Sequence, residues 1–158
     1  MAGEIFLTCI AKSNSGGFLG VGNNNGDIYI FNLDNKDKSV TLKPHHKIVR
    51  SIGFTEDSSK ILTASDDTTI KIVDIASEKI ALSFEGHKES VSCVRSHPND
   101  SRFFYSCSHD KSVKSWDMRM KSCIDTFQTG SSLWSLEAFP KNVITGGESG
   151  VLSIFSIE

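Results

Sequence analysis

Apolar residues recur along this chain at a fixed interval of 42 positions. Two sets of residues follow the interval, the second lying three positions after the first: Leu7, Val49, Val91 and Leu133, then Ile10, Ile52, Val94 and Leu136. A period between about 20 and 50 residues is typical of proteins built from stacked copies of one structural unit. The sequence therefore predicts four equivalent units in series.

Each unit contains further short apolar runs with the composition of β-strands. The runs are rich in Ile, Val and Phe, and they are separated by turn signals at residues 24–26, 66–68, 109–111 and 148–150. Such runs indicate strands joined as hairpins, and no long stripe with the 3.6-residue period of a helix accompanies them. Four strands in a unit of about 40 residues are typical of a β-propeller blade.

Two residue pairs in the third unit narrow this prediction. Gly86-His87 precedes the first strand of that unit, and Trp116-Asp117 ends its third strand. The chain thus resembles WD40 β-propeller proteins. The fold class that we expect is all-β, with three complete four-stranded blades and a three-stranded last blade. The units cover about residues 5–42, 48–84, 90–127 and 133–157 of a single propeller segment, 1–158.

The WD40 resemblance implies a hydrogen-bond network inside each blade. It links a His before the first strand, an Asp in the second turn, a hydroxyl on the second strand and a Trp on the third, so that both nitrogens of a buried His are satisfied. The third unit has the full set, His87, Asp110, Ser106 and Trp116. The second unit has His45, Asp67 and Thr63, and Val73 replaces the Trp, so we expect no indole bond there.

The trio Ser106, His87 and Asp110 also has the residue types of a hydrolytic triad. A structural role is favoured, because part of the trio recurs in the second unit and no Gly-x-Ser-x-Gly elbow accompanies it. We therefore expect no enzyme activity and no cofactor. We also expect no metal site, because the four cysteines form no Cys-x-x-Cys pair and the histidines match no known zinc spacing.

Composition limits the class of partner and the compartment. The formal net charge of −2 and the pI of about 6.2 argue against direct binding of nucleic acid. No run approaches the roughly 18 apolar residues of a membrane span, and residues 1–5 carry no basic region of a signal peptide. Free thiols then indicate a reducing compartment. We expect a cytoplasmic or nuclear protein, or one found in both.

A closer family resemblance rests on residues 48–54, 63–67 and 70–72 of the second unit and on residues 108–117 and 123–127 of the third. These stretches are similar to the WD-repeat subunit of the superkiller complex, whose animal relative also serves the RNA-polymerase-associated elongation complex. The resemblance covers the last four blades of a seven-bladed protein. It implies a scaffold that holds a tetratricopeptide-repeat protein and a helicase in RNA decay. The alternative is an adaptor of a ubiquitin ligase or a chromatin complex.

The resemblance also implies where partners bind. Two positions in each unit are expected around the narrow mouth of the central channel: Thr8, Arg50, Ser92 and Trp134 on the opening strand, and Asn24, Asp66, His109 and Glu148 before the turn. Trp134 is the strongest candidate, because large amphipathic aromatics are frequent binding hot spots. Packing between blades is the alternative for Trp134, and a solvated charge is the alternative for Arg50.

The units do not complete a ring by themselves. The fourth unit stops at its third strand near Phe155, and residues 1–4 are too few to supply a missing outer strand. Three explanations stay open: a piece of a longer protein, which we favour for the natural protein, two copies that close one ring of eight blades, or a small four-bladed ring. Because an open stack exposes apolar faces and a strand edge, we expect the isolated chain to form a homodimer.

Overall fold

The computed structural model describes residues 4–35 and 39–157, and these form four antiparallel sheets. Blade one consists of β1 (Leu7–Lys12), β2 (Phe18–Asn23), β3 (Ile28–Asn32) and β4 (Ser39–Leu42). Blade two consists of β5 (Val49–Phe54), β6 (Lys60–Ser65), β7 (Ile70–Asp74) and β8 (Lys79–Phe84). Blade three consists of β9 (Val91–His97), β10 (Asp100–Ser108), β11 (Ser112–Asp117) and β12 (Ser122–Gln128). Blade four consists of β13 (Leu133–Ala138), β14 (Asn142–Gly147) and β15 (Ser153–Ser156).

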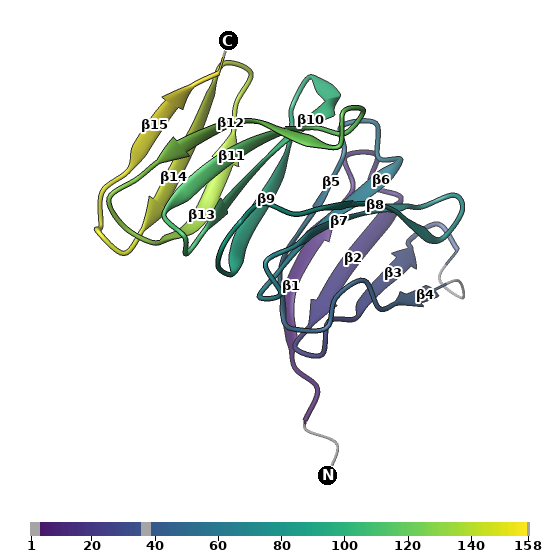
Figure 1. Ribbon diagram of the computed structural model, residues 1–158. Helices are drawn as coiled ribbons and strands as arrows, with labels where there is room; N and C mark the ends of the chain where they lie inside the picture. Colours follow the sequence, from purple (N-terminus) through teal and green to yellow (C-terminus); the bar gives the residue numbers. More distant parts are fainter. Residues whose placement is uncertain (1–3, 36–38, 158) are drawn as a thin grey trace.

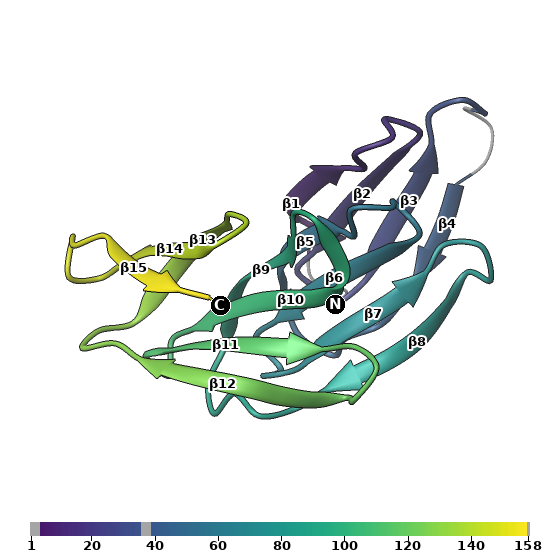
Figure 2. The same ribbon diagram turned by 90° about the horizontal axis from the view of Figure 1, so that it is seen from above.

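This architecture confirms the predicted fold class. Each sheet is a meander in sequence order, with four strands in the first three blades and three in the last. The first strands β1, β5, β9 and β13 contact one another in succession, so they form the inner wall. The blades fan out from this wall in order, and blades one and four lie at the two ends of an open arc (Figures 1 and 2).

The hydrophobic core lies between the blades. Because side chains alternate across a strand, each blade contributes one set of residues to the seam before it and another to the seam after it. In blade three, Val94 and Phe104 face blade two, whereas Cys93 and Val113 face blade four. Among the described residues the blades therefore form three apolar seams, and in each of them two consecutive blades meet through residues from several strands of both.

Aromatic rings fill the seam between blades two and three. The Phe104 ring stacks on Trp116 with centroids 5.9 Å apart, and the Phe84 ring from blade two meets Phe104 edge-on at 5.0 Å. All three side chains are almost completely buried. Edge-to-face and stacked aromatic pairs are favourable beyond the area that they bury, so this seam holds the two complete central blades together.

We expect Gly147→Ala to destabilise the protein by about 1–3 kcal/mol, the usual cost of overpacking a tight site. A Cβ atom at Gly147 would lie 2.0 Å from the carbonyl oxygen of Ser132, a backbone atom that cannot rotate away. Gly130→Ala is the control, because a Cβ there meets nothing within 4 Å. Urea denaturation of both variants measures the effect, and equal free energies of unfolding would show that the close approach is unimportant.

Candidate functional site

A β-bulge opens the inner strand of every blade. The ladder between the first and second strands skips one residue in each case: Thr8, Arg50, Ser92 and Trp134. An extra residue on one strand is unpaired across the ladder, and bulges often re-aim a side chain at a binding site. These four residues are the opening-strand positions that the sequence analysis assigned to partner binding.

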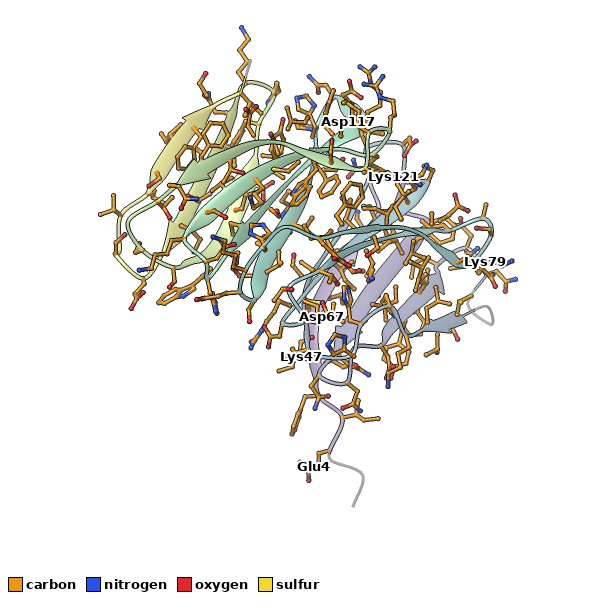
Figure 3. The ribbon with its side chains drawn as sticks, in the orientation of Figure 1. Glu4, Lys47, Asp67, Lys79, Asp117 and Lys121 are labelled. Atoms are coloured by element: carbon orange, nitrogen blue, oxygen red, sulfur yellow. The ribbon has the colours of Figure 1, made fainter. Side chains whose placement is uncertain are left out.

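Backbone hydrogen bonds bring the second set of predicted residues to the same end of the blades. The amides of Asn24, Asp66, His109 and Glu148 donate to the carbonyls of Phe6, Ile48, Ser90 and Ser132 over 2.9–3.1 Å. We call these four residues and the four bulge residues the channel rim. Figure 3 shows Asp67, next to a rim residue, toward the end of the molecule that carries Glu4, with Asp117 and Lys121 toward the other end.

Three of the eight rim side chains donate or accept hydrogen bonds that join them to the backbone of other segments. The hydroxyls of Thr8 and Ser92 donate to the carbonyls of Val49 and Leu133, each in the following blade. The Asn24 side chain accepts from the Phe6 amide at 2.8 Å and donates to the Glu4 carbonyl. These three residues therefore fasten seams and the N-terminal segment, a role that the sequence pattern did not indicate.

Two further rim residues bind each other. The Arg50 guanidinium donates two hydrogen bonds to the Asp66 carboxylate, from Nε at 2.8 Å and from Nη2 at 2.7 Å. Burial alone would raise the pKa of Asp66, but the hydrogen bonds from Arg50 and Ser90 and the Arg50 charge together outweigh this effect and lower the pKa. The pair presents a fixed fork at the rim and not a free positive charge.

Trp134 stands apart from the other bulge residues. Its side chain is 59% exposed, although it occupies the register position of Thr8 and Ser92. Glu148 is exposed nearby on the turn of the same blade, and His109 is half-buried on the turn of blade three. The rim therefore offers one large aromatic surface flanked by polar groups.

A buried hydrogen-bond network in blade three includes Asp110, which directly follows the rim residue His109. His87 Nδ1 lies 2.9 Å from an Asp110 oxygen, and its Nε2 lies 2.8 Å from Ser106 Oγ. The Trp116 indole donates to the same Oγ at 2.8 Å. A carboxylate only accepts hydrogen bonds, so Nδ1 carries the proton and Ser106 donates to Nε2 of the neutral ring.

Electrostatics favour that neutral imidazole. Burial lowers the pKa of His87, although the hydrogen bond that its ring donates to Asp110 opposes this effect. Burial would raise the pKa of Asp110, but bonds from the Ser112 hydroxyl, the Lys88 amide and His87 outweigh it and lower the pKa to about 2. The network thus holds an ionised Asp beside a neutral His at neutral pH.

The same network appears in altered form in the other blades. In blade two, His45 lies 2.9 Å from Asp67 and 2.8 Å from Thr63, and Val73 occupies the Trp position without an indole donor. Blade one uses a motif that the sequence analysis missed: the buried Asn23 bonds the Asp27 side chain and the Tyr29 hydroxyl. An Asn run before a Gly was the available signal.

Blade four keeps the hydroxyl but loses the histidine. Thr145 occupies the register position of Thr63 and Ser106, while Thr129 replaces the His and donates instead to the Lys111 carbonyl. Thr145 Oγ1 is buried and has no hydrogen-bond partner within the described part of the chain. An unpaired buried hydroxyl is unfavourable, so this blade carries a local defect.

The geometry argues against hydrolysis by the Ser106 trio. Ser106 is completely buried, and its oxygen is held by both His87 and Trp116. A nucleophile must reach a substrate carbonyl, and this one is inside a packed seam. Among residues 4–35 and 39–157, no group of three or more His, Cys, Asp or Glu gathers around a possible metal position.

Comparison with known proteins identifies the family. The family model "WD domain, G-beta repeat" matches residues 36–74 and 78–117, which are half of the chain. The chain belongs to the WD40 repeat family. The first matched segment includes β4 to β7 and ends at Asp74. The second includes β8 to β11 and ends at Asp117, the Asp of the Trp-Asp pair. In the part of this WD40 chain that the structure describes, no helix is long and apolar enough to span a membrane.

The similar proteins are named for different cellular processes. The nuclear distribution protein PAC1 of Candida tropicalis is 36% identical over 117 residues, which are 72% of this chain and 24% of PAC1. The ribosome biogenesis protein YTM1 of Phaeosphaeria nodorum is 31% identical over 160 residues, covering 77% of this chain and 34% of YTM1. This WD40 chain therefore spans a quarter to a third of these relatives.

Solved structures share the fold. A structure titled "Structure of U3-55K" overlays with a TM-score of 0.89 and 20% identity, and "Crystal structure of RRP9 WD40 repeats" overlays with a TM-score of 0.90 and 20% identity. Each match covers 99% of this chain and 50% of the solved chain. The four blades thus reproduce half of a WD40-repeat structure.

Removing the two equivalent threonine hydroxyls should have opposite effects. We expect Thr63→Val to destabilise the protein by about 1–3 kcal/mol, because His45 Nε2 loses its buried partner. Thr145→Val should instead stabilise it by up to about 1 kcal/mol, because an unpaired buried hydroxyl is replaced by a methyl group of similar size. Chemical denaturation measures both, and a destabilised Thr145→Val would mean that its hydroxyl has a partner in solution.

Acid should destabilise the protein in two stages. The pKa values of His45 and His87 lie below 6.5 in the folded state, so the unfolded chain binds more protons and stability falls as the pH drops below about 6.5. A second loss follows between about pH 4 and pH 2, because the pKa of Asp110 is lowered from 3.8 to about 2. Urea denaturation across this range measures the effect, and constant stability from about pH 7 to pH 5 would contradict the first stage.

Proposed function

We propose that this chain is a non-catalytic scaffold that binds other proteins through the channel rim, as a subunit of a multiprotein complex. Membership of the WD40 family supports the general role, since propellers of this family generally act as protein-binding scaffolds. The observation that carries the proposal is the exposed Trp134. Trp134 occupies the bulge position at which Thr8 and Ser92 donate to the following blade, and it is 59% exposed.

The rim has the chemistry of a protein-binding surface and not of a nucleic-acid surface. The exposed Trp134 and the exposed Glu148, both at the rim of blade four, combine a large apolar area with a polar edge, the composition of an interface hot spot. The Arg50 charge, which would attract phosphate, is already paired with Asp66. Trp134, Glu148 and His109 are therefore the residues to which we assign direct contact with a partner.

The identity of the complex is the finer part of the proposal. The resemblance of residues 48–54 and 108–117 to the superkiller subunit favours a complex with a tetratricopeptide-repeat protein and a helicase, acting in cytoplasmic RNA decay or in nuclear transcription elongation. The 31% identity to a protein named for ribosome biogenesis favours a second candidate, a ribosome-assembly complex. Affinity purification of the chain followed by mass spectrometry distinguishes them by the proteins recovered.

Trp134→Ala should weaken partner recovery at least about tenfold, the effect expected for a hot-spot aromatic. The free energy of unfolding should barely change, because the side chain is mostly exposed. Phe139→Ala is the matched control: it removes another exposed aromatic, which follows the opposite end of β13. Quantitative co-purification compares the two variants. Equal partner recovery from both would place the binding surface elsewhere than at the rim.

A further inference from the structure

The last blade exposes positions that the internal seams bury. Ile154 in β15 and Leu152, which directly precedes this strand, are 66% and 73% exposed. The register places them where Ile70 and Ile72 stand in blade two, and these are 1% and 0% exposed. Ile70 and Ile72 are buried because blade three packs against them. Blade four therefore exposes the face that each earlier blade packs against the blade that follows it.

The first blade exposes the matching half. Leu7 and Ile10 on β1 are 68% and 67% exposed. Their counterparts one repeat later, Val49 and Ile52, are buried against Ile28 and Ile30 of the preceding blade. Phe31, also partly exposed, corresponds by register to the fully buried Val73. Blade one therefore exposes the face that each later blade packs against the blade that precedes it.

The two exposed faces are complementary because they repeat one interface. The seams between blades one and two and between blades two and three join two alternate apolar residues on the third strand of one blade to two apolar residues, three positions apart, on the inner strand of the next. Leu152 and Ile154 supply the first pair of such a seam, and Leu7 and Ile10 supply the second. They lie at opposite ends of the arc, so they cannot meet within one molecule (Figure 2).

We propose that a second copy of this chain covers both faces, so that two chains close one ring of eight blades. Blade four of each copy packs on blade one of the other, and a two-fold axis makes the two new seams identical. The shape of the arc supports this closure, because the chain overlays half of a solved WD40-repeat chain at a TM-score of 0.90. The channel rim is then completed by both copies.

Light scattering after size-exclusion chromatography tests the proposal on the whole chain. At micromolar concentration we expect a single species with twice the chain mass of 17.3 kDa. Ile154→Asp and Ile10→Lys should each reduce the mass to that of the monomer, because a charge in either face disrupts both identical seams. Neither variant should lose its folded circular dichroism spectrum, since both side chains are exposed in the monomer. Met120→Asp, at an exposed apolar residue outside both faces, should remain dimeric.

Mixing the two variants tests the arrangement itself. An Ile154→Asp copy keeps an intact blade-one face, and an Ile10→Lys copy keeps an intact blade-four face, so the mixture regains one native seam. The introduced charges are opposite and face each other in the second seam. Recovery of the dimer mass on mixing supports the ring. A monomeric wild type, a variant that stays dimeric alone, a mixture that stays monomeric, or oligomers of steadily increasing mass would each overturn it.

Discussion

The burial of apolar side chains between neighbouring blades is the interaction on which the rest of this structure depends. A single antiparallel sheet of three or four short strands has two faces, and one sheet alone cannot cover both. Ile72 and Phe104 are fully buried only because they belong to different blades that meet in one seam. The inner wall, the bulges and the channel rim all take their positions from these seams.

The polar hydrogen-bond network contributes less than the apolar seams and adds to the stability of the blades that contain it. In blade three it satisfies the nitrogens of His87 and the indole of Trp116, so a large aromatic side chain can fill the seam without an unpaired donor. Blade two keeps its seam with Val73 in place of the Trp, and blade four tolerates the unpaired hydroxyl of Thr145. Apolar packing is therefore sufficient to form a blade, and the network adds to its stability and order.

The sequence was sufficient to predict the blades and much less sufficient to predict the rim. The 42-residue period reports which positions face a seam, because burial there requires apolar residues in every copy. The period gives no information on where the side chain at a bulge points. All four units contain the extra residue, so the spacing is the same whether that side chain bonds within the fold or is exposed. The Arg50–Asp66 pair and the Thr8 and Ser92 bonds depend on that direction, so only the structure reveals them.

The difference between Trp134 and its counterparts shows how one register position can serve either the fold or its partners. A hydroxyl at this bulge is short enough to donate to the next blade's first carbonyl, as Thr8 and Ser92 do. Trp134 belongs to the last described blade, where no following blade supplies such a carbonyl, and it remains 59% exposed. Because the seam does not require the bond at every blade, substitution at the bulge changes the surface without disturbing the core. A propeller can thus vary its binding surface at the rim while its seams stay constant.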